Sequence, residues 1–484
     1  MAKKTSPQEQ HRWRENIEAL AVAVIVALLF KYFILEISKI PSGSMQPTLM
    51  GHPESGVNDR VLVDKLSFRF RDPQRYEIVV FKHPLERSRV MVKRLIGMPG
   101  EELKIEGGDL WTRRSPEGEW SILRPPASVQ GELWRVLGVD KPQRAVWGKA
   151  SGDGWLTTGR EARTTVPGTI VYPPGGGTIR DGYADGYPEP LRQPVLDSVG
   201  GSRANNNVAD LRVTGKVEAA ADTSFFSVTL TEGARAYEFR VPGPAGASDA
   251  KAEVRIRAGR ADSDQQERIE RANGGHLSKR KTSFAVENLN DRLKLELDGK
   301  ELLSVEISSS EDRSARIEIG FETGGGKLED LRVYRDIHYI TPDGRGGGWT
   351  VTIPEGHYVM LGDNTQDSAD SRLWEQQTIR LEDPRLPAEV RGNYRKGSGG
   401  ERGILEAQNP IRGTGDHVEE VRFRDVWGEM HWFTSHAPGA GDFTELGPVE
   451  PYSLVPRNLI QGRAMAVFWP FKPQHLLWRL AWLH

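Results

Sequence analysis

The feature that most limits how this chain can fold is an apolar run near its N-terminus, IEALAVAVIVALLFKYFIL, over residues 17–35. Its length is close to the ~20 residues with which a helix spans a bilayer. Lys31 interrupts the run, but it lies near one end, where its long side chain can extend to the interface. The sequence therefore predicts one transmembrane helix over residues 17–36, preceded by an N-terminal segment of residues 1–16.

Basic residues before this run indicate its orientation. Lys3, Lys4, Arg12 and Arg14 all lie on its N-terminal side. Because basic flanks tend to stay in the cytoplasm, we expect the N-terminus inside and the rest of the chain outside. A removable signal peptide is the alternative interpretation. No A-x-A-like cleavage site follows Phe30, however, so an uncleaved anchor is favoured.

The composition excludes several kinds of site. The chain has no cysteine, which removes disulfides, thiolate nucleophiles and cysteine-zinc sites. Its formal net charge is only -2, so bulk charge gives no support for a nucleic-acid partner. No metal or other cofactor is indicated. With 484 residues, the chain is long enough for two to four domains, each with its own core.

The first turn after the apolar run, PSGSMQPTL, holds a serine in a stiffened backbone. Pro41 and Pro47 exclude a regular helix or a central strand, and Gly43 permits conformations that other residues resist. Ser44 is therefore held close to the membrane surface. A proline-bounded linker is the plain alternative, since a serine nucleophile needs a partner that takes its proton.

A lysine supplies a candidate partner. The stretch RVMVKRLIGMPGE, residues 89–101, begins with the pattern of a strand, in which Lys93 shares one face with Met91 and Leu95. Apolar neighbours disfavour the charged ammonium, which is what a lysine base requires. The alternative is an ordinary solvated or snorkelling lysine.

A third stretch, YVMLGDNTQDSADSRLW, passes from an apolar strand into a turn and then into an alternating polar segment. If that segment is extended, Ser368, Asp370 and Arg372 share one face, where the carboxylate and the guanidinium can pair beside the serine. Such a face can orient the amine of another residue. A calcium-binding loop is the alternative, but the ligand spacing of that motif is not met.

Together these three stretches resemble the sequence boxes of the bacterial type I signal peptidases, also called leader peptidases. Two further stretches agree: DRVLVDKLSF with RYEIVVFKHP matches the strand pair between serine and lysine, and LIQGRAMAVFWP matches the closing strand. The resemblance covers roughly residues 15–108, 346–375 and 453–470. It implies a membrane-bound serine endopeptidase that removes signal peptides from secretory preproteins at the outer side of the bacterial cytoplasmic membrane.

The resemblance also implies roles for individual residues. Ser44 would be the nucleophile and Lys93 the general base, and the amide of Ser44 with the hydroxyl of Ser42 would form the oxyanion hole. Ser368 would hydrogen-bond to Lys93. Asp370 and Arg372 would brace the predicted strand that contains Ser368. The turn behind the site would be shaped by Gly362, Asp363 and Asn364. The pocket for the small residue before the cut would be lined by Ile40 and Pro41. Where many members read GDNRDNS, this chain has Thr365, Gln366 and Asp367 before the serine.

The predicted fold is mainly β, with a signal-peptidase-type antiparallel catalytic core interrupted by insertions. Its core would comprise residues 37–108, residues 346–375 and a closing strand in residues 453–470. Residues 109–200 are rich in Gly, Pro and Trp and predict an irregular insertion or linker. Short alternating strands over residues 201–345, with a turn at Asp298-Gly299, predict an inserted antiparallel sandwich. It resembles the concanavalin-like jelly rolls, and it could be a spacer or could bind an unknown ligand.

Two segments follow the catalytic boxes. Residues 376–452 form a second insertion of unassigned role. The tail, residues 471–484, carries Leu476, Leu477, Leu480 and Leu483 at helical spacing, which predicts a short amphipathic helix on the core or in the membrane interface.

One alternative function stays open at the level of the sequence. The chain could be a membrane-anchored surface protein in which the sandwich binds a glycan or a protein while the peptidase frame is inactive. The joint presence of the serine, lysine, aspartate and arginine positions argues against it. For the peptidase, the expected partners are secretory preproteins and membrane lipid.

Overall fold

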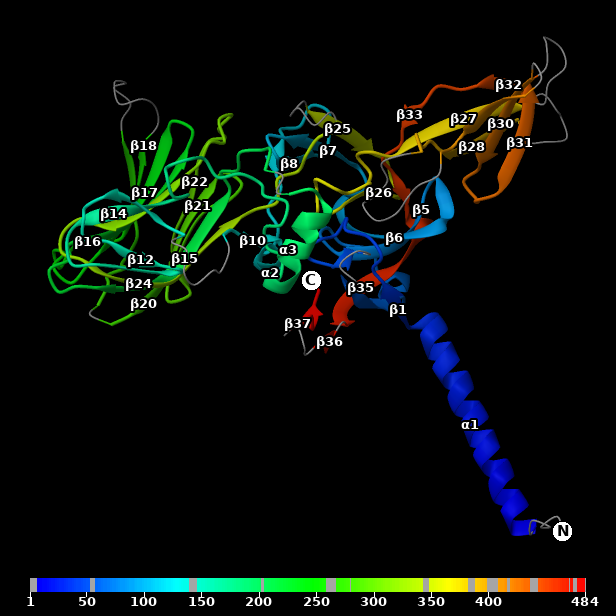
Figure 1. Cartoon of the computed structure of the whole chain (residues 1–484), viewed down its shortest axis with the longest axis horizontal. Helices are drawn as coiled ribbons and strands as arrows, with labels where there is room; N and C mark the ends of the chain where they lie inside the picture. Colours follow the sequence, from blue (N-terminus) through cyan, green and yellow to red (C-terminus); the bar gives the residue numbers. More distant parts are fainter. Residues whose placement is uncertain are drawn as a thin grey trace. The chain divides into compact units, whose positions relative to one another are not determined.

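The computed structural model describes residues 7–52, 57–138, 146–201, 204–257, 267–278, 280–342, 348–381, 388–397, 408–415, 418–435, 443–469, 471–472 and 477–483. The chain forms two compact units (Figure 1). Unit 1 comprises Met1–Glu102 and Val351–His484, and unit 2 comprises Leu103–Thr350. The finer domain limits given above remain predictions.

The chain begins with helix α1, Pro7–Phe33, and turns directly into strand β1, Leu35–Lys39. The predicted helix over residues 17–36 therefore ends earlier than expected, because Leu35 already pairs with a neighbouring strand. The apolar side chains along α1, including Ile17, Leu20 and Leu28, are exposed. Within the described parts of the chain, no helix combines the length and the apolar character needed to cross a membrane.

The main sheet of unit 1 has the order β1-β4-β35-β5-β6-β26-β34, with β38 paired to β35 (Figure 1). Its further strands are β4 (Arg60–Asp64), β5 (Ile78–His83), β6 (Glu86–Gly97), β26 (His357–Leu361), β34 (Val455–Pro456), β35 (Ile460–Trp469) and β38 (Ala481–Trp482). Alternation along β6 directs Met91 and Leu95 into one apolar cluster and Val92 toward another. Side chains thus cover both faces of this sheet.

Strands β6 and β26 are distant in sequence but antiparallel neighbours. Val359 lies opposite Gly97, and Leu361 lies opposite Arg94. This pairing brings the residues that follow β26 beside the middle of β6. It is the step that assembles the candidate site from two separated parts of the sequence.

The helix predicted in the tail is wrong for the described residues, which are extended instead. They form β36 (Phe471–Lys472), β37 (Leu477–Trp478) and β38, and Trp482 and Ala481 pair with β35. The open edge of β35 satisfies the backbone hydrogen bonds of the tail, which outweighs its helical leucine spacing. Leu476 lies outside the described residues.

Unit 2 contains the predicted antiparallel sandwich, now seen as two sheets (Figure 1). One sheet has the order β12-β13-β24-β15-β20-β21-β22, with β10 on β24, and the other has the order β11-β14-β23-β16-β17-β18-β19. Their inward side chains, such as Val213 and Val286 from one sheet and Val228 and Phe239 from the other, form one core. The strands are β10 (Arg135–Val136), β11 (Gly148–Ser151), β12 (Leu156–Thr158), β13 (Glu161–Thr164), β14 (Gly168–Tyr172), β15 (Leu211–Ala219), β16 (Phe225–Glu232), β17 (Arg235–Pro242), β18 (Glu253–Arg257), β19 (Arg268–Arg271), β20 (Thr282–Asn288), β21 (Arg292–Leu297), β22 (Lys300–Glu306), β23 (Ile317–Phe321) and β24 (Gly326–Arg335).

The segment predicted as irregular, residues 109–200, is more ordered than expected. It contains helices α2 (Ala127–Leu133) and α3 (Glu189–Ser198), and its strands β10 to β14 belong to the sandwich sheets. Trp147, Trp155 and Ile170 are buried in the sandwich core. The strands are too short for their alternation to stand out in a Gly- and Pro-rich sequence, which explains the difference.

The remaining strands form small sheets. A four-stranded sheet has the order β25-β7-β8-β9, made of β25 (Trp349–Ile353), β7 (Glu101–Glu106), β8 (Asp109–Arg113) and β9 (Ser121–Ile122). A short pair joins β2 (Gly51–His52) to β3 (Val57–Asn58). The second insertion holds β27 (Glu375–Leu381), β28 (Glu389–Asn393), β29 (Ile411–Gly415), β30 (Val418–Arg424), β31 (Met430–Ser435), β32 (Phe443–Leu446) and β33 (Glu450–Pro451), with its own small core.

Candidate active site

The proline-bounded turn holds Ser44 inside unit 1, between β1 and β2. Its backbone turns through the bonds from Gln46 N to Gly43 O, 3.0 Å, and from Leu49 N to Met45 O, 2.9 Å. Ser44 is only 2% exposed. The stretch is therefore an ordered, buried turn rather than a loose linker.

Lys93 projects from the middle of β6 and donates a hydrogen bond from its Nζ to Ser44 Oγ. The lysine is 1% exposed. The alternation of β6 places it between Met91 and Leu95, which are both buried in the adjoining core. The structure thus brings together the two residues that sequence reasoning singled out, from elements that are 49 residues apart.

Ser42 lies on the same turn as Ser44. Its Oγ is 3.5 Å from Ser44 Oγ, and the residue is largely buried. The turn therefore directs two hydroxyl groups toward one point. Whether Ser42 serves an oxyanion hole stays a prediction.

The residues that follow β26 hold the Ser44 turn through its backbone. Asn364 N donates to Ser44 O at 3.1 Å, and Asn364 Nδ2 donates to Gly43 O at 3.1 Å. Gly362 passes so close that a Cβ at this position would lie 2.5 Å from Ser44 O and 2.1 Å from Ser368 Oγ. Glycine is required here by close approach.

Asp363 forms a buried ion pair that sequence reasoning missed. Its carboxylate accepts from Arg94 Nε at 2.9 Å and from Nη2 at 2.8 Å, and both side chains are fully buried. Thr48 Oγ1 donates to the same carboxylate at 2.6 Å. The alternation of β6 indicates only that Arg94 faces away from Lys93. An arginine on a strand is usually solvated, so the sequence carried no signal for this pairing.

Asp370 and Arg372 pair as predicted, but in a turn rather than in a strand. Arg372 donates to the carboxylate from Nε at 2.8 Å and from Nη2 at 2.7 Å, while Gly362 N donates to it at 2.9 Å. Burial acts to raise the pKa of Asp370, but Arg372, the Gly362 amide and the charge of Lys93 outweigh it and lower the pKa. Asp370 also accepts from the backbone N of Arg372, the local bond of an aspartate turn, which explains the absent strand.

Ser368 does not make the hydrogen bond to Lys93 that the resemblance implied. Its Oγ is buried and has no hydrogen-bond partner among the described residues. The side chain packs against the backbone of Gly362 instead, while Lys93 donates to Ser44. Ser368 thus borders the site without a hydrogen bond to the lysine.

The two residues expected to line a substrate pocket differ in exposure. Ile40 is buried in an apolar cluster with Met45 and Val61, whereas Pro41 is exposed beside Ser42. Contact with a substrate stays a prediction for both. Of the three departing residues before Ser368, Asp367 continues the turn through a bond from its N to Asn364 O, 3.1 Å.

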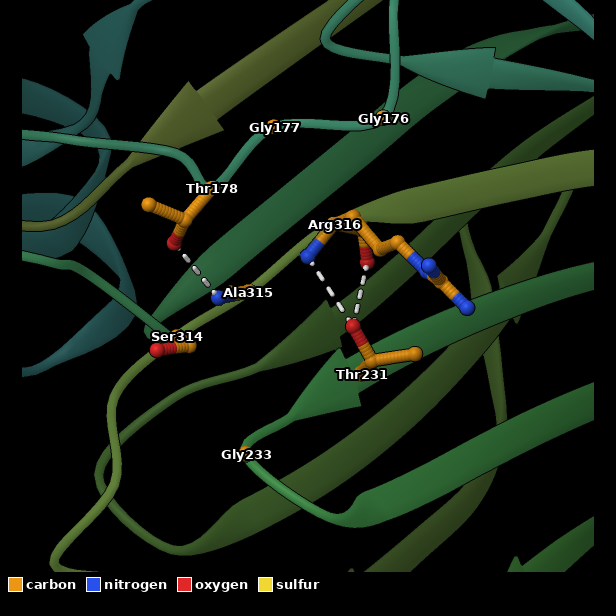
Figure 2. Close-up of a pocket in the computed structure, with 8 residues that line it drawn as sticks. All are labelled: Gly176, Gly177, Thr178, Thr231, Gly233, Ser314, Ala315 and Arg316. Carbon is orange, nitrogen blue, oxygen red and sulfur yellow. Dashed lines mark hydrogen bonds between the residues drawn. The ribbon is translucent and has the colours of Figure 1, made fainter.

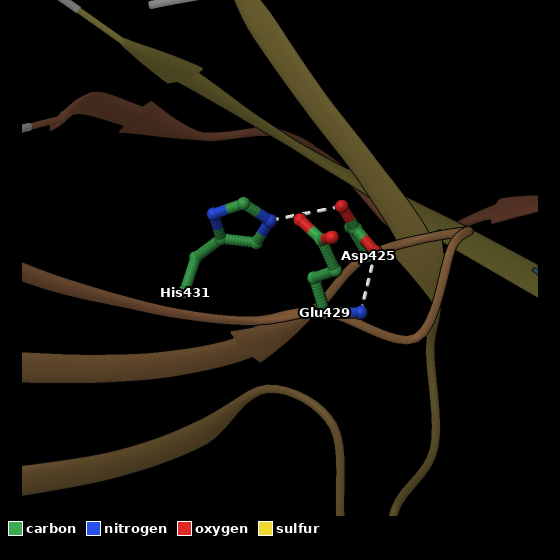
Figure 3. Close-up of side chains that lie close together, drawn as sticks. All are labelled: Asp425, Glu429 and His431. Atoms are coloured by element: carbon green, nitrogen blue, oxygen red, sulfur yellow. Dashed lines mark hydrogen bonds and ion pairs between the residues drawn. The ribbon is translucent and has the colours of Figure 1, made fainter.

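A second cluster of ligand-type side chains lies on the hairpin of β30 and β31. Asp425, Glu429 and His431 bring one ligand atom each within 4.8 Å of one another (Figure 3). His431 Nε2 is 2.9 Å from Asp425 Oδ2, and Asp425 Oδ1 accepts from the Trp427 and Glu429 amides. Asp425 therefore stabilises the turn through Oδ1 and contacts His431 through Oδ2, so both of its oxygens already have hydrogen-bond partners.

Unit 2 has a small cavity of about 260 Å³. Glycines and hydroxyl side chains line it, with Arg316 at its edge (Figure 2). Thr178 Oγ1 accepts from Ala315 N, and Thr231 Oγ1 bonds to the backbone of Arg316. Because these two hydroxyls already bond to the backbone, they do not indicate which ligand the cavity would bind.

Comparison with solved structures finds likenesses of low score. Porphyranase B from Zobellia galactanivorans is 11% identical and covers 43% of this chain and 87% of its own, with a TM-score of 0.26. A galectin of Caenorhabditis elegans is 10% identical over 26% of this chain and 83% of its own, with a TM-score of 0.21. The sandwich is therefore identified from its own strand order and core.

Comparison with sequences is more specific. The family model described as signal peptidase, peptidase S26, matches residues 13–121 and 290–383. The chain is 38% identical to probable signal peptidase I-2 of Synechocystis sp. over 137 residues, which are 27% of this chain and 59% of that protein. It is 35% identical to signal peptidase I of Leptolyngbya laminosa over 148 residues, which are 28% of this chain and 70% of that protein. With a shared model, a relative matched over most of its length and a serine bonded to a buried lysine, this chain belongs to the peptidase S26 family of signal peptidases.

Proposed function

We propose that this protein is a membrane-bound serine endopeptidase that removes signal peptides from exported preproteins. The observation that carries the proposal is the buried hydrogen bond between Lys93 Nζ and Ser44 Oγ. A serine is a weak nucleophile unless a neighbouring base takes its proton. Here the Lys93 amine is buried and bonded to the serine oxygen, so it is placed to take that proton.

The proposed reaction proceeds in two steps. Lys93 takes the proton of Ser44, whose Oγ attacks the scissile carbonyl carbon, and the leaving amine departs with the proton that Lys93 returns. The resulting ester between Ser44 and the signal peptide is then hydrolysed by water, with Lys93 again acting as base. The exported protein leaves first, and the signal peptide second.

Charge on the carbonyl oxygen would be stabilised from the same turn. We assign the oxyanion hole to the amide of Ser44 and the hydroxyl of Ser42, whose Oγ already lies 3.5 Å from the attacking oxygen. Removal of one such donor costs about 100- to 1000-fold in rate. Ile40 and Pro41, just before this turn, would contact the small residue that precedes the cut.

The surrounding residues would hold Ser44 and Lys93 in position relative to each other. Gly362 and Asn364 fix the backbone of the serine turn, and Asp370 with Arg372 forms a buried ion pair behind them. Ser368 would act through packing against Gly362.

Membrane attachment is supported by exposed apolar side chains. They lie along α1, on β1 (Ile37), β35 (Trp469) and β38 (Trp482), and at Leu480 just before β38. Tryptophan is enriched at membrane interfaces. We propose that residues 17–36 attach the protein to the bacterial cytoplasmic membrane, with the N-terminus inside and the catalytic unit outside.

The proposal is tested by cleavage of a preprotein peptide with an A-x-A site, using the full chain in detergent. Ser44→Ala and Lys93→Ala should abolish cleavage. The exposed residues Ser121 and Lys82 provide matched controls, and Ser121→Ala and Lys82→Ala should retain it. Folded wild-type protein that leaves the peptide intact would contradict the proposal and favour the inactive-frame alternative.

A further inference from the structure

The turn that carries Ser44 is closed at its base by one residue, Asp59. Ile40 N donates to Asp59 O at 2.9 Å, and Asp59 N donates to Met50 O at 2.7 Å. The carboxylate adds a third bond by accepting from Met50 N at 2.7 Å. The two ends of the turn also touch each other, since a Cβ on Gly51 would lie 2.5 Å from Ile40 O.

Arg479, from the C-terminal tail, binds this closure and the turn itself. Its Nε lies 2.8 Å from Asp59 Oδ1, and its Nη2 lies 2.8 Å from Oδ2, a bidentate geometry. The same Nη2 donates to Pro47 O at 3.2 Å and to Thr48 O at 3.0 Å. The Asp59 side chain is fully buried, and the Arg479 side chain is 13% exposed. One guanidinium therefore joins the base of the serine turn to its second half.

The tail has its own attachment to unit 1, so Arg479 projects from a fixed backbone. Leu483 N donates to Met465 O at 2.7 Å, next to the pairing of β38 with β35. The Leu483 side chain is buried in the cluster that contains Ile40, Met45 and Leu49. The tail thus packs on the residues that flank Ser44.

The opposite side of the turn is held by a different group. Thr48 accepts from Arg479 through its carbonyl, and its hydroxyl donates to Asp363, the partner of Arg94. Arg94 is the residue after Lys93. Thr48 is therefore fixed from two sides, by the tail and by the strand that carries the lysine.

We propose that Arg479 is a positioning residue for the nucleophile turn, so that the tail segment, residues 477–483, is part of the catalytic apparatus. The inference rests on the proposed function. Arg479 acts through Asp59, Pro47 and Thr48 and sets the distance between Ser44 Oγ and Lys93 Nζ. Because a misplacement of about 1 Å costs up to about 100-fold in rate, loss of this contact should lower kcat and leave KM nearly unchanged.

A simple loss of stability has to be separated from loss of positioning. Removal of Arg479 alone leaves Asp59 as a buried carboxylate without its cation, and breaking a buried pair in this way is strongly destabilising. Burial already raises the pKa of Asp59, although Arg479 acts to lower it. Asp59→Asn removes that charge and keeps an oxygen that can accept from Met50 N. The double variant Arg479→Met/Asp59→Asn should therefore recover stability while the carbonyls of the turn stay unbound.

The experiment compares wild type, Arg479→Met, the double variant and Arg457→Met. Arg457 is the matched control, because its guanidinium also binds a carboxylate and backbone carbonyls, at Asp72, Phe68 and Arg71. We expect kcat to fall about 10- to 100-fold in the single and the double variant, with KM within about twofold. Only the single variant should show a lowered Tm. A double variant with wild-type kcat would overturn the proposal.

A second readout does not need activity. Hydrogen exchange at the amides of Gln46 and Leu49, which close the turn, should be at least about tenfold faster in the double variant than in Arg457→Met. If the wild-type protein cleaves nothing but exchange is faster in the double variant, the positioning role stands and only the peptidase function is refuted. Unchanged exchange would refute the positioning role, whatever the activity.

Discussion

Gly362 allows a sharp prediction, because the space for a side chain at this position is already filled. An added Cβ would lie 2.5 Å from Ser44 O, whereas real Cβ contacts under 3.0 Å are essentially never seen. The Ser368 hydroxyl, at 2.1 Å, could rotate aside, but the Ser368 Cβ, at 2.7 Å, would not move with that rotation. The Ser44 carbonyl is backbone and moves only with its turn. Gly362→Ala must therefore displace Ser44 by about half an ångström or more. On the scale of about 100-fold in rate per 1 Å, kcat should fall about tenfold or more.

The assay is cleavage of the A-x-A peptide by Gly362→Ala, Ser368→Ala and the double variant, with Tm measured alongside. Overpacking also costs about 1 to 3 kcal/mol of stability, so the variant should fold with a lowered Tm. Ser368→Ala should not rescue kcat, because the clash with Ser44 O remains. Gly348, which has no atoms within 4 Å of an added Cβ, gives the control Gly348→Ala. A folded Gly362→Ala protein with wild-type kcat would refute this account of the turn.

Three further predictions address the rest of the molecule. Arg94→Met leaves the Asp363 carboxylate buried without its cation and should lower the free energy of unfolding by about 3 to 5 kcal/mol. Adding Asp363→Asn should restore part of that loss. A loss below about 1 kcal/mol in urea unfolding would contradict this prediction. Burial, reinforced by Asp210, raises the pKa of Asp336 to about 7. The folded protein therefore holds a proton on this carboxyl that the unfolded chain, with a pKa near 3.8, has already lost. The free energy of unfolding should fall by about 1.4 kcal/mol for each pH unit between these two pKa values. In urea unfolding at several pH values, Asp336→Asn should reduce this dependence of the free energy of unfolding on pH. An unchanged dependence would show that other groups cause it. Replacement of residues 103–350 by a short Gly/Ser turn should leave peptide cleavage within about tenfold of wild type, because β6 and β26 carry their own pairing; failure of the shortened chain to fold would show that the insertion supports unit 1.

The central contact of the site could be predicted from the sequence, because its chemistry requires particular residue types. A serine in a proline-bounded turn needs a base, and strand alternation gives Lys93 apolar neighbours. The pairing of Asp370 with Arg372 was also predictable, but the buried ion pairs of Arg94 with Asp363 and of Arg479 with Asp59 were not. Arg94 and Asp363 are 269 residues apart, and Arg479 and Asp59 are 420 apart, so only the tertiary fold brings them together.

The errors concern local structure where a tertiary partner or a side chain competes with a pattern. The tail has helical leucine spacing, yet its residues pair with β35, whose edge offers hydrogen bonds that an isolated short helix lacks. The segment around Asp370 alternates like a strand, but its carboxylate accepts from the backbone of Arg372 and closes a turn. In both places the periodicity was real, and another interaction was stronger.

The insertion between β6 and β26 shows why a site of this kind survives a large interruption. The chemistry depends on the register of these two strands, since a slip of one residue would turn Lys93 and the residues after β26 to the wrong faces. That register is specified inside unit 1 by the buried core on β6 and β26 and by the ion pair of Arg94 with Asp363, directly beyond the pairing of Arg94 with Leu361. Because each doubling of a connecting loop adds only about 0.6 kcal/mol of closure entropy, the connection contributes little to the choice of register. The buried ion pair therefore stabilises both the pairing of the interrupted strands and the approach of Gly362 to Ser44.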